Sequence, residues 1–161
     1  MRSPQNGRLP YPPHRPYDGV GNRITHLERI GATTTPYAYA YAYDPLNRLI
    51  QVSNSATGAV LETDTYDPLG NRLTKISGSV ATYYRYDAAN QLTQTCADAG
   101  CVTTTGTFTY DLNGNLVSRT DGPATSMAYD AENRLAWISV AGQPEQTYAY
   151  DDQGRRIRKT V

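Results

Sequence analysis

Aspartate recurs along this chain at a regular spacing, each time directly after a tyrosine. Carboxylates are a residue type that can perform general acid–base catalysis. The regular spacing of 19 to 26 residues favours another role, because each copy begins a turn-like stretch that an Asp side chain can cap through Asx-type hydrogen bonds. We therefore expect a structural signature in the seven copies, which are Tyr17-Asp18, Tyr43-Asp44, Tyr66-Asp67, Tyr86-Asp87, Tyr110-Asp111, Tyr129-Asp130 and Tyr150-Asp151.

No other set of residues forms a recognisable catalytic, cofactor or metal motif. His14 and His26 have no Ser or Cys partner at a known motif spacing, and neither a GxSxG sequence nor a phosphate-binding Gly loop occurs. A metal site is not expected at Cys96 and Cys101, because the nearest His is His26 and there is no second Cys pair. The sequence thus predicts no catalytic, cofactor-binding or metal-binding residues, and no enzyme.

Cys96 and Cys101 enclose the four residues Ala97-Asp98-Ala99-Gly100. An Asp and a Gly at these positions could form a turn that brings the two thiols together. A disulfide there would indicate an oxidising compartment, whereas two free thiols are the equally open alternative.

The signature copies alternate between two forms. The residue four positions after the Tyr is Gly in one form and Asn in the other, and both types accept the left-handed backbone angles of a tight turn. The distances from Tyr43 to Tyr86 and from Tyr86 to Tyr129 are both 43 residues, so the repeating unit could be a pair of copies. The Gly form has Gly21, Gly70, Gly114 and Gly154, and the Asn form has Asn47, Asn90 and Asn133.

The residues around each turn have the pattern of two strands. Residues 37–43 alternate Tyr and Ala, which places every Tyr on one face of a strand. A second strand follows each turn, as in residues 134–138, so each copy predicts a β-hairpin. Leu135 and Ile138 are three residues apart, which does not suit a flat strand, and a bulge just after the turn would reconcile them. We expect an all-β fold of tandem antiparallel hairpins in a curved or spiralling sheet.

Composition limits the classes of function. The chain has 161 residues with 15 basic and 15 acidic side chains, so a net charge of zero argues against nucleic-acid binding. No stretch is long and apolar enough for a membrane span, and the N-terminus does not resemble a secretory signal peptide. With 14 Tyr but one Phe and one Trp, the tyrosines are expected to supply the apolar area of the core. We predict a Pro-rich, poorly ordered segment at residues 1–16 and a hairpin array at residues 17–161.

The repeated patterns YDPLGNRL and YDPLNRLI resemble the YD repeats of RHS proteins, which also occur in toxin-complex shell subunits and teneurins. The resemblance covers about residues 17–161. It implies a spiralling β-sheet that closes as a hollow shell around a C-terminal toxin or stands as an extracellular scaffold, without chemistry of its own. It also implies a secreted or cell-surface location, with the rest of a larger shell or its toxin cargo as partners.

This sequence departs from the family pattern in two ways. Family shells have many more repeats than the seven found here, so the chain resembles one part of the wall of such a shell. RHS shells end in a plug with a DPxGL-like signature near a self-cleavage site. Asp67-Pro68-Leu69-Gly70 comes close to that signature, but Asn71 replaces the Leu and the stretch lies inside an ordinary repeat.

Other interpretations remain at this stage. A carbohydrate or cell-surface binding module could use exposed Tyr39 and Tyr41 to bind a glycan, and a remnant of a larger RHS gene would have no function. Open sheet edges predict self-association of the isolated chain. The repeated arginines could line an anion-binding wall, but we expect them to cover tyrosine rings or to pair with the Asp of a neighbouring turn. These arginines are Arg23, Arg48, Arg72, Arg134 and Arg155.

Overall fold

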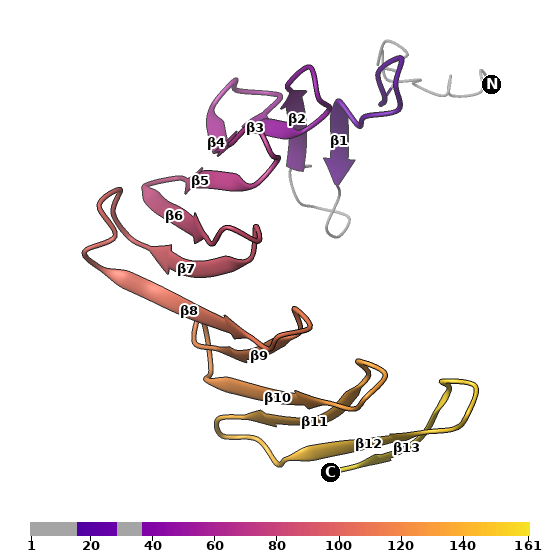
Figure 1. The fold of residues 1–161 in the computed structure, drawn as a ribbon. Coiled ribbons are helices and arrows are strands. Elements are labelled where there is room, and N and C mark those ends of the chain that lie inside the picture. Colours follow the sequence, from indigo (N-terminus) through magenta and orange to yellow (C-terminus); the bar gives the residue numbers. More distant parts are fainter. Residues whose placement is uncertain (1–15, 29–36) are drawn as a thin grey trace, which may run out of the picture. The chain divides into compact units, whose positions relative to one another are not determined.

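The computed structural model describes residues 16–28 and 37–161 (Figure 1). Within these residues the regular elements are all β-strands, and the paired strands run antiparallel. The predicted all-β fold of tandem antiparallel hairpins is therefore confirmed. No helix long and apolar enough to cross a membrane occurs in the described part of the chain. The expected Pro-rich segment at residues 1–16 lies outside the described residues except for Pro16, so its lack of order stays a prediction.

The chain divides into two compact units between Asp64 and Thr65. In each unit the strands lie in the sheet in the order in which they occur along the chain (Figure 1). The first unit contains β1 (Thr25–Glu28), β2 (Tyr37–Tyr43), β3 (Leu49–Asn54) and most of β4 (Val60–Tyr66). The second contains β5 (Arg72–Ser77), β6 (Val80–Tyr86), β7 (Leu92–Cys96), β8 (Thr104–Tyr110), β9 (Leu116–Arg119), β10 (Thr125–Tyr129), β11 (Leu135–Val140), β12 (Gln146–Tyr150) and β13 (Arg156–Thr160).

Each signature Asp begins the turn of one hairpin. In the turn between β10 and β11, the backbone N–H of Asp130 donates to the carbonyl oxygen of Arg134 at 2.9 Å. The backbone N–H of Asn133 donates back to the carbonyl oxygen of Asp130 at 3.0 Å. The same two backbone bonds close the turns that begin at Asp18, Asp44, Asp67, Asp87, Asp111 and Asp151.

A β-bulge follows each of five turns at the same position. Tyr129 pairs with Leu135 but Ala128 pairs with Trp137, so Ala136 is the extra residue of the bulge. Because Ile138 then pairs with Met127, the bulge places Ile138 on the same face as Leu135. The apolar spacing of three residues thus fits a strand. Equivalent shifts occur in the hairpins β2–β3, β6–β7, β8–β9 and β12–β13.

Little of the apolar surface is enclosed. Among the described residues, Cys96 and Phe108 are the buried apolar side chains, while the signature tyrosines from Tyr43 onward are half-buried and Tyr17 is exposed. The expected tyrosine core is therefore a partly open face in each unit. The physical reason is that a sheet buries a face only against another layer of structure, and neighbouring strands cover just the flanks of each ring.

Candidate functional site: a ladder of aspartate turns

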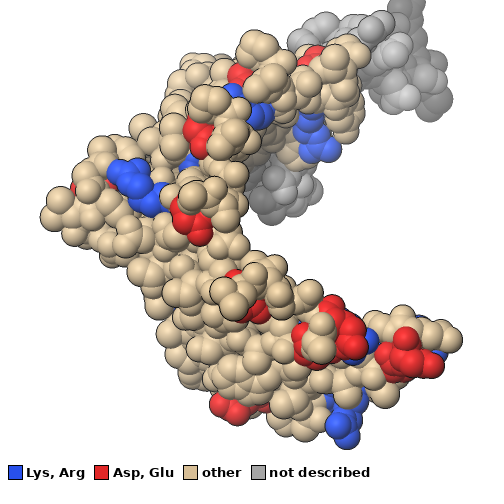
Figure 2. Space-filling model, viewed as in Figure 1, with Lys and Arg blue, Asp and Glu red and all other residues tan. Residues whose placement is uncertain are grey.

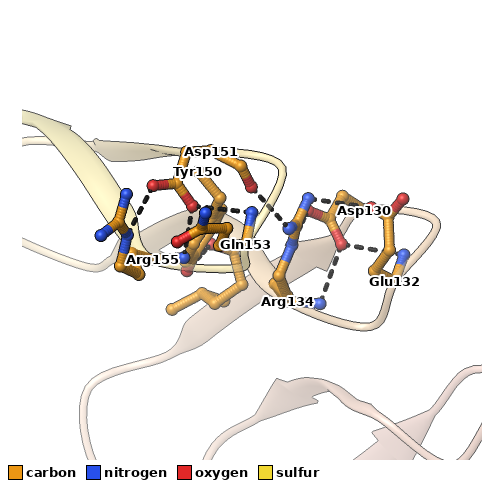
Figure 3. Close-up of polar contacts among 8 residues, drawn as sticks. Asp130, Glu132, Arg134, Tyr150, Asp151, Gln153 and Arg155 are labelled. Atoms are coloured by element: carbon orange, nitrogen blue, oxygen red, sulfur yellow. Dashed lines mark hydrogen bonds and ion pairs between the residues drawn. The ribbon is translucent and has the colours of Figure 1, made fainter.

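The carboxylate of each signature Asp is bound inside its own turn. Asp130 Oδ1 accepts the backbone N–H groups of Glu132 at 3.0 Å and Arg134 at 2.9 Å, as Figure 3 shows. This Asx arrangement satisfies backbone donors that the reversal of the chain would otherwise leave unpaired. We call the seven turns the turn ladder. The same backbone donors, two and four residues further on, serve Asp18, Asp44, Asp67, Asp87, Asp111 and Asp151.

The second carboxylate oxygen accepts a side-chain donor from the residue four positions later in the turns at Asp18, Asp44, Asp67, Asp111, Asp130 and Asp151. Arg134 Nε lies 2.7 Å from Asp130 Oδ2, and equivalent ion pairs join Arg48 to Asp44 at 2.6 Å and Arg155 to Asp151 at 2.7 Å. The expectation for the repeated arginines was that they cover tyrosine rings or pair with the Asp of a neighbouring turn, whereas these three ion pairs join each Arg to the Asp of its own turn. Each Arg lies four residues after its own Asp, on the opposite side of the turn, so a short local ion pair can form.

At Asp130 and Asp151 these bonds hold the carboxylate in the anionic form. The backbone N–H and the guanidinium of Arg155 lower the pKa of the Asp151 carboxyl. Burial alone would raise the pKa of Asp130, but hydrogen bonds from the backbone and side chain of Arg134 outweigh it and the pKa is lowered. A carboxylate with a lowered pKa and occupied oxygens is poorly suited to accept or donate a proton near neutral pH. The arrangement is that of a turn cap.

The turn residues named from the sequence all have positive φ angles. In the Gly form the angles are 95° at Gly21, 95° at Gly70, 85° at Gly114 and 77° at Gly154. In the Asn form they are 60° at Asn47, 61° at Asn90 and 60° at Asn133. Other side chains adopt this left-handed region at a cost, which explains why Gly or Asn occupies the position.

The signature tyrosines connect one hairpin to the hairpin before it. The Tyr129 hydroxyl donates to the carbonyl oxygen of Leu116 at 3.0 Å, from the end of β10 to the start of β9. Burial raises the pKa of the Tyr43, Tyr86 and Tyr110 hydroxyls, which keeps these donors protonated. In five such bonds the acceptor is the residue six positions after the preceding signature Tyr. The other bonds run from Tyr43 to Arg23 at 2.8 Å, from Tyr86 to Arg72 and from Tyr110 to Leu92 at 3.0 Å, and from Tyr150 to Leu135 at 2.8 Å.

Side chains also join neighbouring turns directly. Asn115 Nδ2 donates to Asp111 Oδ2 in its own turn at 3.0 Å and to Asn133 Oδ1 in the following turn at 2.8 Å. Sequence reasoning did not identify Asn115 or its equivalents, Asn22 and Asn71, as contact residues. Their signal in the sequence was the Asn that directly follows the turn glycine.

Arg134 makes a different connection to the next turn. Its Nη1 donates to the carbonyl oxygen of Asp151 at 3.4 Å, and its guanidinium carbon lies 4.8 Å from the centre of the Tyr150 ring. Figure 3 shows Arg134 between the two turns. Arg23 and Arg72 likewise cover the rings of Tyr17 and Tyr84 at 5.8 Å, as expected for these arginines.

The structure joins Cys96 and Cys101 in a disulfide. Asp98 organises the enclosed turn, because its carboxylate accepts the backbone N–H groups of Val102 at 3.0 Å and Thr103 at 2.7 Å. Of the two alternatives that the sequence left open, the structure therefore has the bonded one, in the connection between β7 and β8.

Of the two histidines, the structure describes His26, which lies beside Arg23 and Tyr39. The His26 ring stacks on the ring of Tyr39, with centres 6.3 Å apart, while His14 lies outside the described residues. No group of three or more His, Cys, Asp or Glu side chains placed to hold a metal occurs in residues 16–28 and 37–161. On the face drawn in Figure 2, acidic and basic side chains lie interspersed over a surface that is mostly uncharged.

A match to a known protein family identifies the family of this chain. The sequence pattern of the teneurin YD-shell family matches residues 16–160. The chain belongs to this family. The resemblance to RHS/YD-repeat proteins found in the sequence is thereby confirmed, and the turn ladder is the structural form of its YD repeat.

Curated relatives of this YD-shell chain are much longer proteins. The tRNA nuclease WapA of Bacillus subtilis is 36% identical over 125 residues, which is 74% of this chain and 5% of WapA. The double-stranded DNA deaminase toxin A of Burkholderia cenocepacia is 27% identical over 165 residues, which is 89% of this chain and 11% of that protein. The chain therefore spans a small part of either relative.

The chain is also similar to a solved structure. The crystal structure of TcdB2–TccC3 without its hypervariable C-terminal region matches 89% of this chain and 10% of the solved chain, with 19% identity and a TM-score of 0.47.

Proposed function

We propose that this chain is one segment of a YD-repeat shell that encloses a toxic domain carried by the same polypeptide. The observation that supports the proposal is the series of tyrosine-to-carbonyl bonds in the second unit, where Tyr86, Tyr110, Tyr129 and Tyr150 each bond to the preceding hairpin. In such a series each hairpin is stabilised by its neighbours, as in other repeat proteins. The relatives named for nuclease and deaminase activities are many times longer than this segment, which leaves room for further repeats and another domain.

The segment itself contributes structure and no catalysis in this proposal. Its repeated carboxylates accept hydrogen bonds within their own turns, and at Asp130 both oxygens are bound there. A disulfide between Cys96 and Cys101 fits a wall that works outside the reducing cytosol, as the secreted or cell-surface location implied by the family would require.

The test begins with the reading frame on both sides of this segment. We expect further Tyr-Asp hairpins in frame and a different domain downstream of them. In the full-length protein, limited proteolysis should leave that downstream domain intact, and the double variant Tyr129→Ala and Tyr150→Ala should expose it by removing two bonds between hairpins.

The matched control is Tyr148→Ala, whose hydroxyl bonds to Gln146 in the same strand and not to another hairpin. Its downstream domain should stay protected. Cleavage of that domain at the same rate in the wild type, the control and the double variant would refute enclosure. The absence of further hairpins would refute the shell.

A further inference from the structure

Gly turns and Asn turns alternate along the chain, and a side-chain hydrogen bond between neighbouring turns follows the same alternation. Where an Asn turn follows a Gly turn, the side-chain amide after the turn glycine spans both of them. Asn115 uses one N–H for the Asp111 carboxylate and the other for Asn133 Oδ1. We call this contact the asparagine clasp. It recurs from Asn22 to Asn47 at 2.9 Å and from Asn71 to Asn90 at 3.0 Å.

The acceptor explains why the second turn has Asn. The left-handed position at Asn133 needs either Gly or a residue that tolerates positive φ. Glycine would satisfy the backbone but would leave the amide of Asn115 without its second acceptor. Asparagine satisfies both demands, so its use in one form of the turn follows from the contact with the preceding hairpin.

Within the second unit, the two junctions at which a Gly turn follows an Asn turn have different side-chain contacts. After the Asn turn at Asp130, Arg134 reaches the next turn through the Asp151 carbonyl oxygen and the Tyr150 ring. After the Asn turn at Asp87, the equivalent residue is Gln91, whose Nε2 lies 3.3 Å from the position that a Cβ atom would take at Gly114 of the next turn. The clasp therefore joins hairpins in pairs.

We propose that the asparagine clasp makes the hairpin pair the assembly unit of this chain and determines which form of hairpin follows which. The residues that carry this specificity are the Asn after the turn glycine and the left-handed Asn of the next turn. This role concerns the order of hairpins within the wall and does not depend on whether the wall encloses a cargo.

A double-mutant cycle on the full chain tests the clasp, with Asn115→Ala, Asn133→Gly and both together. The readout is amide hydrogen exchange at Asp130, whose N–H closes the turn. A hydrogen bond of typical strength corresponds to about a 2–12-fold loss of protection. We expect Asn133→Gly to reduce protection about 2–12-fold more in the wild type than in the Asn115→Ala background. Equal losses in both backgrounds would overturn the clasp.

The matched control combines Asn115→Ala with Asn47→Gly, the same two substitutions at positions that belong to different clasps. Their effects should add. If the Asn115→Ala protein does not fold, the cycle of Asn22→Ala and Asn47→Gly tests an equivalent clasp with the same criterion.

Amide exchange in the Asn133→Gly protein also tests whether two hairpins form one unit. Protection should fall at the Asp111 amide, which belongs to the same pair, and change less at the Asp151 amide, which belongs to the next hairpin. A loss at Asp151 equal to that at Asp111 would show that the clasp does not define pairs.

Discussion

At the scale of single residues, the Tyr-Asp dipeptide divides two tasks between adjacent side chains. In Tyr129-Asp130, the Asp carboxylate accepts donors from its own turn, while the Tyr hydroxyl donates to the carbonyl oxygen of Leu116 in the preceding hairpin. One residue thus shapes a hairpin and the other attaches it to its neighbour. The pair recurs because every hairpin needs both functions.

The Tyr129→Phe substitution tests the attachment, because it removes the hydroxyl and keeps the ring. We expect the free energy of unfolding to fall by about 0.5–1.5 kcal/mol, the usual net contribution of one hydrogen bond, as measured by urea denaturation. Tyr148→Phe is the control, since its hydroxyl bonds to the Gln146 side chain of the same strand and that partner can turn to water. A Tyr129→Phe protein as stable as the wild type would contradict the attachment role.

The aspartate caps predict a loss of stability in acid. The pKa values of Asp44, Asp111 and Asp151 lie below the ordinary value of 3.8, chiefly because of hydrogen bonds from the residue four positions later. Folding therefore favours the anion, and its contribution is complete well above pH 3.8. As the pH falls below that value, the unfolded chain binds protons first, so stability decreases until the folded carboxyls are also protonated.

Urea denaturation between pH 7 and pH 2.5 measures this dependence. We expect a flat region near neutral pH and a steep decline in acid. The Asp130→Asn protein should be less stable at neutral pH and should show a shallower decline, because one titrating cap is missing. A stability that does not change below pH 4 would argue against the caps.

At the scale of the elements, the hairpins need small residues where two segments approach closely. Gly106 in β8 pairs with Thr95 in β7 and is buried. A Cβ atom at this position would lie 2.6 Å from Thr95 Oγ1 and 2.7 Å from Asp121 Cβ. The Thr95 hydroxyl is itself held by a hydrogen bond from Thr105 at 3.1 Å, so it cannot easily move away.

The Gly106→Ala substitution is therefore expected to lower the free energy of unfolding by about 1–3 kcal/mol, the usual effect of overpacking. Thermal or urea unfolding provides the measurement. The control is Gly122→Ala, where a Cβ atom would meet nothing within 4 Å. If both variants unfold at the same midpoint, the close approach at Gly106 is not a constraint.

At the scale of the whole molecule, the described residues bury few apolar side chains completely. Leu73, Ile76 and Ile157 are among those that stay exposed, since no second layer covers the sheet in the second unit, residues 65–161. Backbone hydrogen bonds between strands, Tyr hydroxyl bonds and turn caps therefore contribute more to the stability of the fold than a hydrophobic core does.

We accordingly expect a urea m-value below that of a compact domain of 161 residues, because m scales with the surface exposed on unfolding. Equilibrium denaturation followed by circular dichroism measures it. A concentration-independent m-value equal to that of a compact domain would contradict the open arrangement. A value that rises with protein concentration, together with faster sedimentation, would instead reveal the predicted self-association.

The sequence alone determined what depends on residues close together in the chain. The Asp, the left-handed Gly or Asn and the alternating strand pattern specify the hairpin, because every bond of the turn lies within five residues. The family resemblance, too, came from these local patterns. The bulge could be inferred because the spacing of Leu135 and Ile138 conflicts with a flat strand.

Only the tertiary structure decided how the hairpins meet. The bond from Tyr129 to Leu116 and the clasp from Asn115 to Asn133 join residues 13 and 18 positions apart. Such contacts depend on the separation and register of neighbouring hairpins, which the intervening connections set and which no local pattern encodes. For the same reason the sequence predicted a tyrosine core, whereas the single layer of sheet in each unit leaves those rings half-buried.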